Sequence, residues 1–337
     1  MPMRTLVKRS LASRTVIRAA DRGGRPRILA LMYHDLREDG DFVNWLRIGA
    51  SAFSRHLAFL QRVGTIIDPV AAAHPRDLPA DRLHFLLTFD DGYINNLRLA
   101  APILARHGAH AQFFVSTSHM QDRRPFWSDI VTTPIQAEGL AVLDLRDHGL
   151  GEFRFRAGDA DARWQDIQAL LVALKARGNE DEPVVAAVLE DLQRRYAATL
   201  ARNLPRFRPM EPAEVAALAA SPGCRIGSHA HRHRILTRLG DEDLARNLGE
   251  SRRLLEDLVQ APVGDLAYPN GDHDERVRRA AACAGYERAY TVAPGLLTGD
   301  SPHLARPRLG IGGTGPEWLP GFQITGELLR DRRTRAS

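Results

Sequence analysis

The sequence predicts an α/β protein built on a parallel sheet or barrel, interrupted by a mainly helical insertion. Short apolar runs of strand length alternate with longer segments that carry hydrophobic residues at helical spacing. This alternation is typical of parallel sheets with helical crossovers. Residues 121–209 break the rhythm, which resumes after 210. With 337 residues, of which 44% are hydrophobic and 26% charged, the composition is that of an ordinary globular protein.

Before the insertion, apolar runs predict buried strands, and apolar residues three or four apart predict helices. The predicted strands cover 28–33, 83–89 and 111–117, and the predicted helices cover 50–63 and 96–107. Gly108 ends the second helix, because glycine readily adopts the left-handed conformation that closes helices. We therefore expect strand and helix to alternate from residue 27 onward.

The insertion predicts a strand or hairpin near 151–157 and two long helices over 161–177 and 183–202. Strands are predicted afterwards at 225–228, 264–268, 289–292 and 309–311, with helices at 213–220, 241–258 and 274–284. The predicted organisation is a basic lead over 1–26, a core domain over 27–320 that contains the 121–209 insertion, and a C-terminal tail over 321–337.

The net charge is +5, and basic residues dominate the lead, where Asp21 is the single acid. We expect a solvated terminus there, or a peripheral contact with an anionic membrane. No nucleic-acid partner is expected, because basic and aromatic residues are not interleaved in a recognisable module. The chain lacks a long apolar run and a signal-peptide pattern, and Cys224 and Cys283 form no disulfide framework. These features favour a cytoplasmic protein, resting at most on a membrane surface.

Two adjacent carboxylates, Asp90 and Asp91, follow the predicted strand 83–89 in the segment Thr-Phe-Asp-Asp-Gly. Active sites of parallel α/β proteins lie at the carboxyl ends of strands. Adjacent acids repel, and a cation between or beside them relieves that cost. One acid could then bind a metal while the other acts as a base. The alternative is a plain turn, because Asp-Gly favours turns.

Three histidines follow the predicted strand 225–228. His229 and His233 are four residues apart, which predicts that both imidazoles share one face of a helical turn. His231 would point elsewhere and is not expected to be a ligand. With Asp91, the two histidines would form a three-ligand site with open positions for water and substrate, as catalytic metals require. The alternative is a polar loop with surface histidines.

A third segment, Leu-Ala-Tyr-Pro-Asn-Gly-Asp over 266–272, combines an apolar strand with turn residues. A backbone N–H in this turn could face an oxyanion, although the pattern alone also describes a bare turn.

Taken in order, these three blocks resemble the polysaccharide deacetylases, carbohydrate esterase family 4 with its NodB-like homology domain. The segments ILALMYHDL, ARHGAHAQFFVST and PFWSD also resemble parts of that family, the last one its exopolysaccharide-type members. The resemblance covers about 27–120 and 210–312. It implies a distorted (β/α)7-type barrel and a divalent metal, commonly zinc.

The resemblance also implies roles for single residues. Asp90 is similar to the general base of the family, and Asp91, His229 and His233 are similar to its metal ligands. Asn270 follows the proline of the third block, where the backbone N–H usually meets the oxyanion and the residue is more often tyrosine.

Two features depart from the family pattern. No arginine ahead of the third block clearly matches the one that often steadies the base, and the late segment RPRLGIGG holds no histidine to serve as general acid. His303 lies nearby in sequence. His34, Asp129 and Arg308 are candidates for supporting roles, with a structural role as the alternative for each.

The implied function is hydrolysis of a carbon–nitrogen bond other than a peptide bond: removal of the N-acetyl group from a sugar in a poly- or oligosaccharide, in bacterial polysaccharide biosynthesis or modification. Two alternatives stay open. One is a deacylase acting on a lipid- or nucleotide-linked sugar. The other is a catalytically silent sugar-binding member of the same fold.

Overall fold

The computed structural model describes residues 13, 15–17, 24–39, 46–312 and 319–336. Its centre is an eight-stranded sheet in the order β11-β10-β9-β6-β5-β1-β12, with β4 paired to β5 off this path. The strands are β1 (Arg27–Tyr33), β4 (Thr65–Ile66), β5 (Leu83–Phe89), β6 (Ala111–Val115), β9 (Cys224–Ser228), β10 (Asp265–Ala267), β11 (Arg288–Tyr290) and β12 (Leu309–Gly310). Every neighbouring pair in this sheet is parallel, so the predicted parallel arrangement is confirmed.

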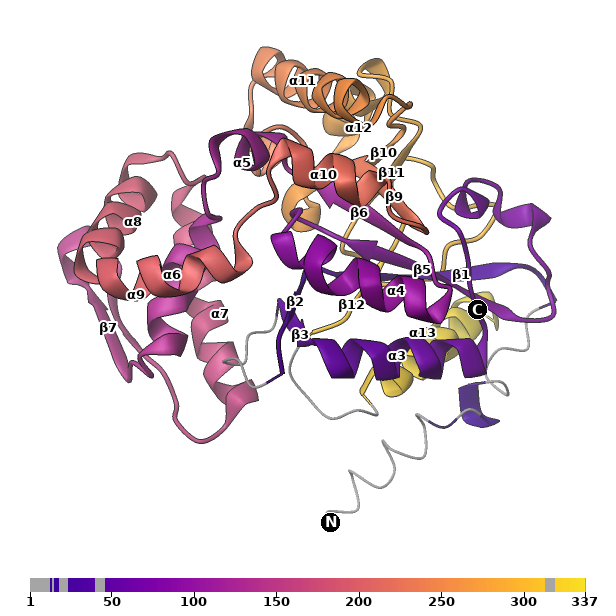
Figure 1. The fold of residues 1–337 in the computed structure, drawn as a ribbon, viewed down its shortest axis with the longest axis horizontal. Coiled ribbons are helices and arrows are strands. Elements are labelled where there is room, and N and C mark those ends of the chain that lie inside the picture. The colour runs from indigo at the N-terminus through magenta and orange to yellow at the C-terminus, as the bar shows by residue number, and fades with distance from the viewer. Residues whose placement is uncertain (1–12, 14, 18–23, 40–45, 313–318, 337) are drawn as a thin grey trace.

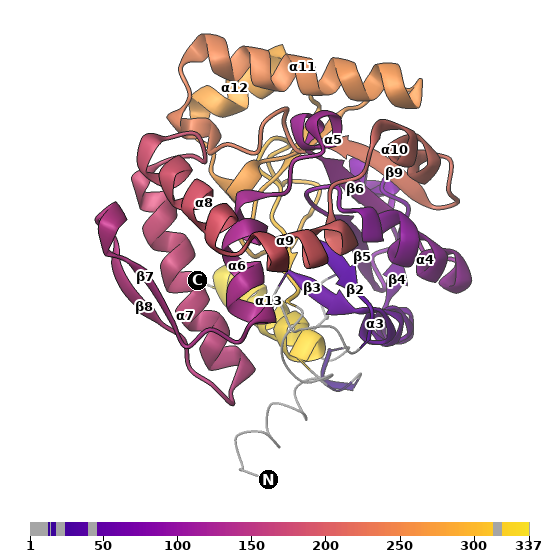
Figure 2. The same cartoon turned by 60° about the vertical axis from the view of Figure 1, so that its left-hand side comes forward.

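Strands β1 and β5 form the middle of the sheet and pair from Arg27↔Leu83 to Tyr33↔Phe89. Both are buried along their whole length, which explains why their sequences are apolar runs without alternation. The sheet curls into an open barrel rather than a closed one (Figure 2). Because all strands run the same way, their carboxyl ends meet at a single edge.

Helices pack around the outside of this sheet (Figure 1). They are α3 (Ala50–Val63), α4 (Ala101–His107), α10 (Pro212–Ala219), α11 (Asp241–Val259), α12 (Glu275–Cys283) and α13 (Leu319–Ala336). The helix predicted over 96–107 begins as a π-helix, η3 (Asn96–Ala100), before α4. Pro102 explains the break, because proline lacks the N–H that an α-helical bond requires. Residues assigned to a tail from the sequence form α13, whose Ile324 and Leu328 are buried in the main core.

The insertion forms a lobe beside the barrel, on the left in Figure 1. Helix α5 (Thr117–Asp122) leads into the lobe, whose elements are α6 (Trp127–Ala137), β7 (Val142–Leu145), β8 (Gly151–Arg154), α7 (Ala160–Arg177), α8 (Pro183–Arg195) and α9 (Ala197–Asn203). The lobe has a hydrophobic cluster of its own, which includes Trp164, Leu170 and Val188. Strands β7 and β8 form an antiparallel hairpin. The helix predicted over 183–202 is divided at Tyr196, where the backbone leaves the helical conformation.

Most of the basic lead lies outside the described residues, so its membrane contact stays a prediction. Within the described part of the chain, no helix is both long and apolar enough to cross a bilayer. Cys224 and Cys283 are free thiols.

A buried charge network joins the insertion to the barrel. Arg47, in the small parallel sheet of β2 (Asp35–Arg37) and β3 (Arg47–Gly49), pairs with Asp35 at 3.2 Å and with Asp129 on α6. Its guanidinium lies 3.7 Å from the ring centroid of Phe207. The Tyr93 hydroxyl donates to Asp129 at 2.9 Å. Asp129, a sequence candidate for a site role, therefore belongs to this structural network.

We expect Arg47→Met to lower the free energy of unfolding by about 3–5 kcal/mol, because it leaves two buried acidic side chains without the cation that both of them contact. Urea denaturation at pH 7 measures this loss. The matched control is Arg76→Met, since Arg76 and its partner Asp300 are 75% and 66% exposed, and exposed pairs contribute at most about 1 kcal/mol. Equal losses in the two variants would contradict the role given to Arg47.

The same network predicts a pH dependence of stability. Burial raises the pKa of Asp35 to about 7, and the nearby Asp129 charge adds to the rise against the opposing effect of Arg47. The folded state therefore keeps a proton that the unfolded state loses, so stability falls as pH rises from about 4 to about 7. Asp35→Asn should flatten this part of the profile, measured as denaturation midpoint against pH. A slope as steep as that of the parent would show that Asp35 is not its source.

Candidate metal centre and active site

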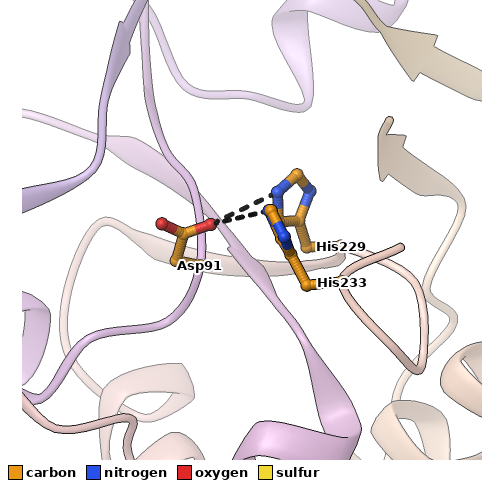
Figure 3. A group of neighbouring side chains, drawn as sticks. All are labelled: Asp91, His229 and His233. Atoms are coloured by element: carbon orange, nitrogen blue, oxygen red, sulfur yellow. Dashed lines mark ion pairs between the residues drawn. The ribbon is translucent and has the colours of Figure 1, made fainter. Parts of the chain in front are cut away.

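Three side chains predicted as metal ligands meet at the carboxyl edge of the sheet (Figure 3). Asp91 follows β5, and His229 and His233 follow β9. The Oδ1 atom of Asp91 lies 3.4 Å from Nε2 of His229 and 3.4 Å from Nε2 of His233. Their candidate ligand atoms all lie within 4.8 Å of one another. Strands β5 and β9 are separated only by β6, which explains how residues far apart in the sequence converge.

A tight turn after β5 sends the two neighbouring acids in different directions. Asp91 has a φ of 76°, and the Gly92 N–H donates to the Asp90 carbonyl at 3.0 Å. A hydrogen bond across one residue with positive φ is a γ-turn of the rare, strained kind. Gly92 also has a positive φ, of 85°, and a Cβ there would lie 3.1 Å from Val115. Strain of this sort persists where the surrounding structure enforces it, often at functional sites.

The histidine segment differs from its prediction. His229 and His233 do not share a helical turn, because the residues between them form an irregular loop with Ala230 at a φ of 61°. The left-handed residue folds the loop back, so the rings still meet, with centroids 4.9 Å apart. His231 points elsewhere and contacts Thr117 Oγ1 at 3.0 Å, as expected for a residue that is no ligand.

Both imidazoles are held by neighbouring groups. The Nδ1 atom of His229 lies 2.8 Å from the Ala267 carbonyl, which can only accept a hydrogen bond. Nδ1 therefore carries a proton, and Nε2 is the ring nitrogen that faces Asp91. His233 packs edge-on against Phe126, in the PFWSD segment, at 5.4 Å. Burial lowers the pKa of His233 to about 4 despite the opposing charge of Asp91, so this ring is neutral at pH 7.

The residues present fit a divalent cation. Asp91 Oδ1 is buried and has no hydrogen-bond partner among the described residues. Burial opposes its ionisation, but contact with His229 leads the effects that lower the pKa of Asp91 well below its usual value, so the group is a carboxylate. Asp91 Oδ1 and His229 Nε2 are 3.4 Å apart, a spacing at which one cation can bind both atoms. Two ligands about 2.1 Å from a tetrahedral zinc would be about 3.4 Å apart.

Asp90, predicted as the general base, pairs with an arginine from the other end of the chain. Arg308 donates from Nη1 to Oδ1 at 2.6 Å and from Nη2 to Oδ2 at 2.7 Å. The guanidinium is fixed in turn by the Thr88 hydroxyl and the Thr291 carbonyl. Burial raises the pKa of Asp90, but the Arg308 charge outweighs it and leaves the pKa below its usual value.

Arg308 contacts the predicted base, as the arginine of the family pattern often does, although no arginine ahead of the third block matches that pattern. It comes instead just before β12, which pairs with β1 beside β5. Its signal in the sequence was a single arginine in the segment RPRLG, too weak to assign a partner. The structure gives it one: a buried, two-pronged contact with the predicted base.

Asn270 occupies a turn after β10, in the short helix η7 (Pro269–Gly271). Its φ of 58° and the Gly271 N–H bond to the Tyr268 carbonyl at 2.8 Å match a type II turn. That turn places proline second and asparagine or glycine third, which is the order here. The Asn270 side chain is exposed and accepts a hydrogen bond from Lys175. The oxyanion role of its N–H stays a prediction.

The two remaining candidates from the sequence, His34 and His303, lie at different distances from the acidic pair. His34 follows β1, and burial lowers its pKa while Asp91 and Asp90 raise it, which places the ring within the field of both acids. His303 is exposed, and its Nδ1 lies 3.5 Å from Arg306. Among the described residues, no contact joins His303 to Asp90 or Asp91, or to the two histidines that are predicted ligands.

The comparison with known families decides the classification. The polysaccharide deacetylase model matches residues 78–147 and 178–289, more than half of the chain. The chain belongs to the polysaccharide deacetylase family. The matched ranges contain Asp90, Asp91, His229, His233 and Asn270, while residues 148–177, which include β8 and α7, fall between them.

Similar proteins support the same fold. The putative polysaccharide deacetylase YxkH of Bacillus subtilis is 26% identical over 92 residues, which cover 27% of this chain and 33% of that protein. The Streptococcus pyogenes deacetylase PplD, solved with acetate, is 17% identical and superposes with a TM-score of 0.56 over 88% of this chain and 99% of its own. IcaB from Ammonifex degensii is 16% identical and superposes with a TM-score of 0.56 over 90% of this chain and 97% of its own. The predicted distorted (β/α)7-type barrel is thereby confirmed.

Proposed function

We propose that this polysaccharide deacetylase family member hydrolyses the N-acetyl amide of an N-acetylated sugar in a poly- or oligosaccharide, with the help of a divalent metal. One observation carries the proposal: Asp91 Oδ1, buried and without a hydrogen-bond partner in the described part of the chain, faces the Nε2 atoms of His229 and His233, directly beside an ionised Asp90. Zinc is the proposed metal, because two imidazoles and one carboxylate are a usual catalytic zinc set.

Each residue has a defined part in this proposal. Asp91, His229 and His233 would hold the cation, which supplies Lewis acidity that polarises a carbonyl and eases deprotonation of water. Asp90 accepts a proton from the attacking water as its oxygen bonds to the carbonyl carbon. The leaving nitrogen takes up a proton as the C–N bond breaks, which releases acetate and the amine. Arg308 orients Asp90 and keeps it ionised through two hydrogen bonds. The Asn270 N–H would donate to the oxygen that becomes negative.

The test is acetate release from a panel of N-acetylglucosamine oligomers, a polymeric N-acetylated glycan and a lipid- or nucleotide-linked N-acetyl sugar. We expect release from an oligomer or polymer that stops after chelation and returns with zinc. Release from the lipid- or nucleotide-linked sugar alone would show that the substrate is a linked sugar and not an oligo- or polysaccharide. Glycan binding without any release, in protein shown to contain metal, would identify a silent member and refute the proposal.

A further inference from the structure

The insertion reaches the metal centre through the carboxyl end of α7. Arg238 donates to the Lys175 carbonyl at 2.7 Å, and the Ile235 N–H donates to the Asn179 side chain at 2.9 Å. An ion pair between Arg234 and Asp181 continues this row of contacts toward His233. Residues 175–181 are therefore docked on the segment that directly follows His233.

Lys175 extends this contact to the turn after β10. Its ammonium donates to the side-chain oxygen of Asn270, and the Asn270 amide donates to Asp272 at 2.5 Å. Lys175 is half-buried, and burial lowers its pKa while Asp272 and Asp91 raise it. Two carboxylates therefore lie near this ammonium, one in the turn and one in the metal centre.

The turn itself needs support. Asn270 adopts a left-handed backbone conformation that costs free energy in residues with a side chain, although asparagine tolerates it better than most. Gly271 follows with a φ of 81°, and a Cβ there would come within 2.5 Å of Val292. A charge-assisted hydrogen bond to the Asn270 side chain favours the conformation that aims its backbone N–H.

We propose that Lys175 is a positioning residue of the active site, which holds the side chain of Asn270 and thereby fixes the Tyr268–Gly271 turn. Lys175 lies between the two ranges that match the family model, so the insertion of this chain supplies it. The catalytic consequence rests on the proposed function, whereas the structural consequence does not. The helical lobe would then contribute directly to the geometry of the reacting groups.

Two measurements separate these consequences. The first is hydrogen–deuterium exchange of the Gly271 amide, whose bond to Tyr268 closes the turn. We expect Lys175→Met to speed its exchange about tenfold, because opening of the turn exposes it. Arg238→Gln, which removes a neighbouring docking contact but not the bond to Asn270, should leave exchange within about twofold of the parent. Unchanged exchange in Lys175→Met would overturn the proposal, whatever the activity.

The second is a double-mutant cycle on acetate release. Lys175→Met should lower kcat about tenfold and change KM less than about twofold. The Asn270 N–H remains in this variant but is less well aimed, so only part of its stabilisation of the oxyanion is lost. Lys175→Arg should recover most of kcat. In an Asn270→Gly background, which keeps the N–H but not the side chain, Lys175→Met should have no further effect. Additive losses would overturn the proposal, and a parent enzyme without activity would instead count against the proposed function.

Discussion

Asp90→Asn is expected to lower kcat for acetate release by at least about 10³-fold while the protein keeps its metal. Asparagine preserves the shape of the side chain but cannot accept a proton, and general-base catalysis contributes about 10²–10⁴-fold. The proposed metal ligands are separate residues, so metal content should stay that of the parent. Steady-state kinetics together with elemental analysis of the purified variant measure both quantities.

A control is needed because Asp90→Asn also leaves the buried Arg308 without its charged partner. Asp129→Asn removes a carboxylate from another buried arginine pair, that of Arg47. It should lose stability but keep kcat within about threefold, since Asp129 is assigned no chemical step. If Asp90→Asn turned over like the parent, or if both variants lost the same fraction of kcat, Asp90 would not be the general base.

Asp91→Ala is expected to lose both bound metal and acetate release. It removes one of the three proposed ligands and the single carboxylate among them. Loss of outer-shell partners alone typically weakens metal binding about 10–100-fold, so loss of a direct ligand should weaken it more. Zinc should also stop raising the melting temperature, because stabilisation by a ligand requires binding to the folded state. Calorimetric zinc titration and thermal unfolding with and without zinc measure these effects.

His231→Ala is the matched control, since His231 lies in the same loop but contacts Thr117 and Glu250. It should bind zinc with an affinity within about threefold of the parent. If Asp91→Ala still bound zinc as tightly as His231→Ala, the ligand assignment would be wrong.

The sheet could be predicted from the sequence because strands that are buried on both faces are mostly apolar along their length. Strands β1 and β5 are continuous apolar runs, and the acids that follow β5 are visible as an abrupt change. Parallel strands also place their carboxyl ends at one edge, so Asp91 and His229 could be expected to meet. The insertion was visible for the opposite reason, as a loss of the strand and helix alternation.

Other features depend on geometry that no local pattern carries. The imidazoles meet because Ala230 adopts a left-handed conformation, which residue spacing alone does not reveal. Arg308 and Asp90 are 218 positions apart, and the sequence around Arg308 does not show which acid it meets. The contact between Lys175 and Asn270 likewise depends on how the insertion docks. Tertiary contacts of single charged residues were therefore beyond prediction from the sequence.

The most direct test of the central claim is a crystal structure of the zinc-loaded protein, with data collected on both sides of the zinc absorption edge. We expect one anomalous peak per chain, within about 2.0–2.2 Å of Asp91 Oδ1, His229 Nε2 and His233 Nε2. A peak elsewhere, or none at these residues in protein that releases acetate, would contradict the account.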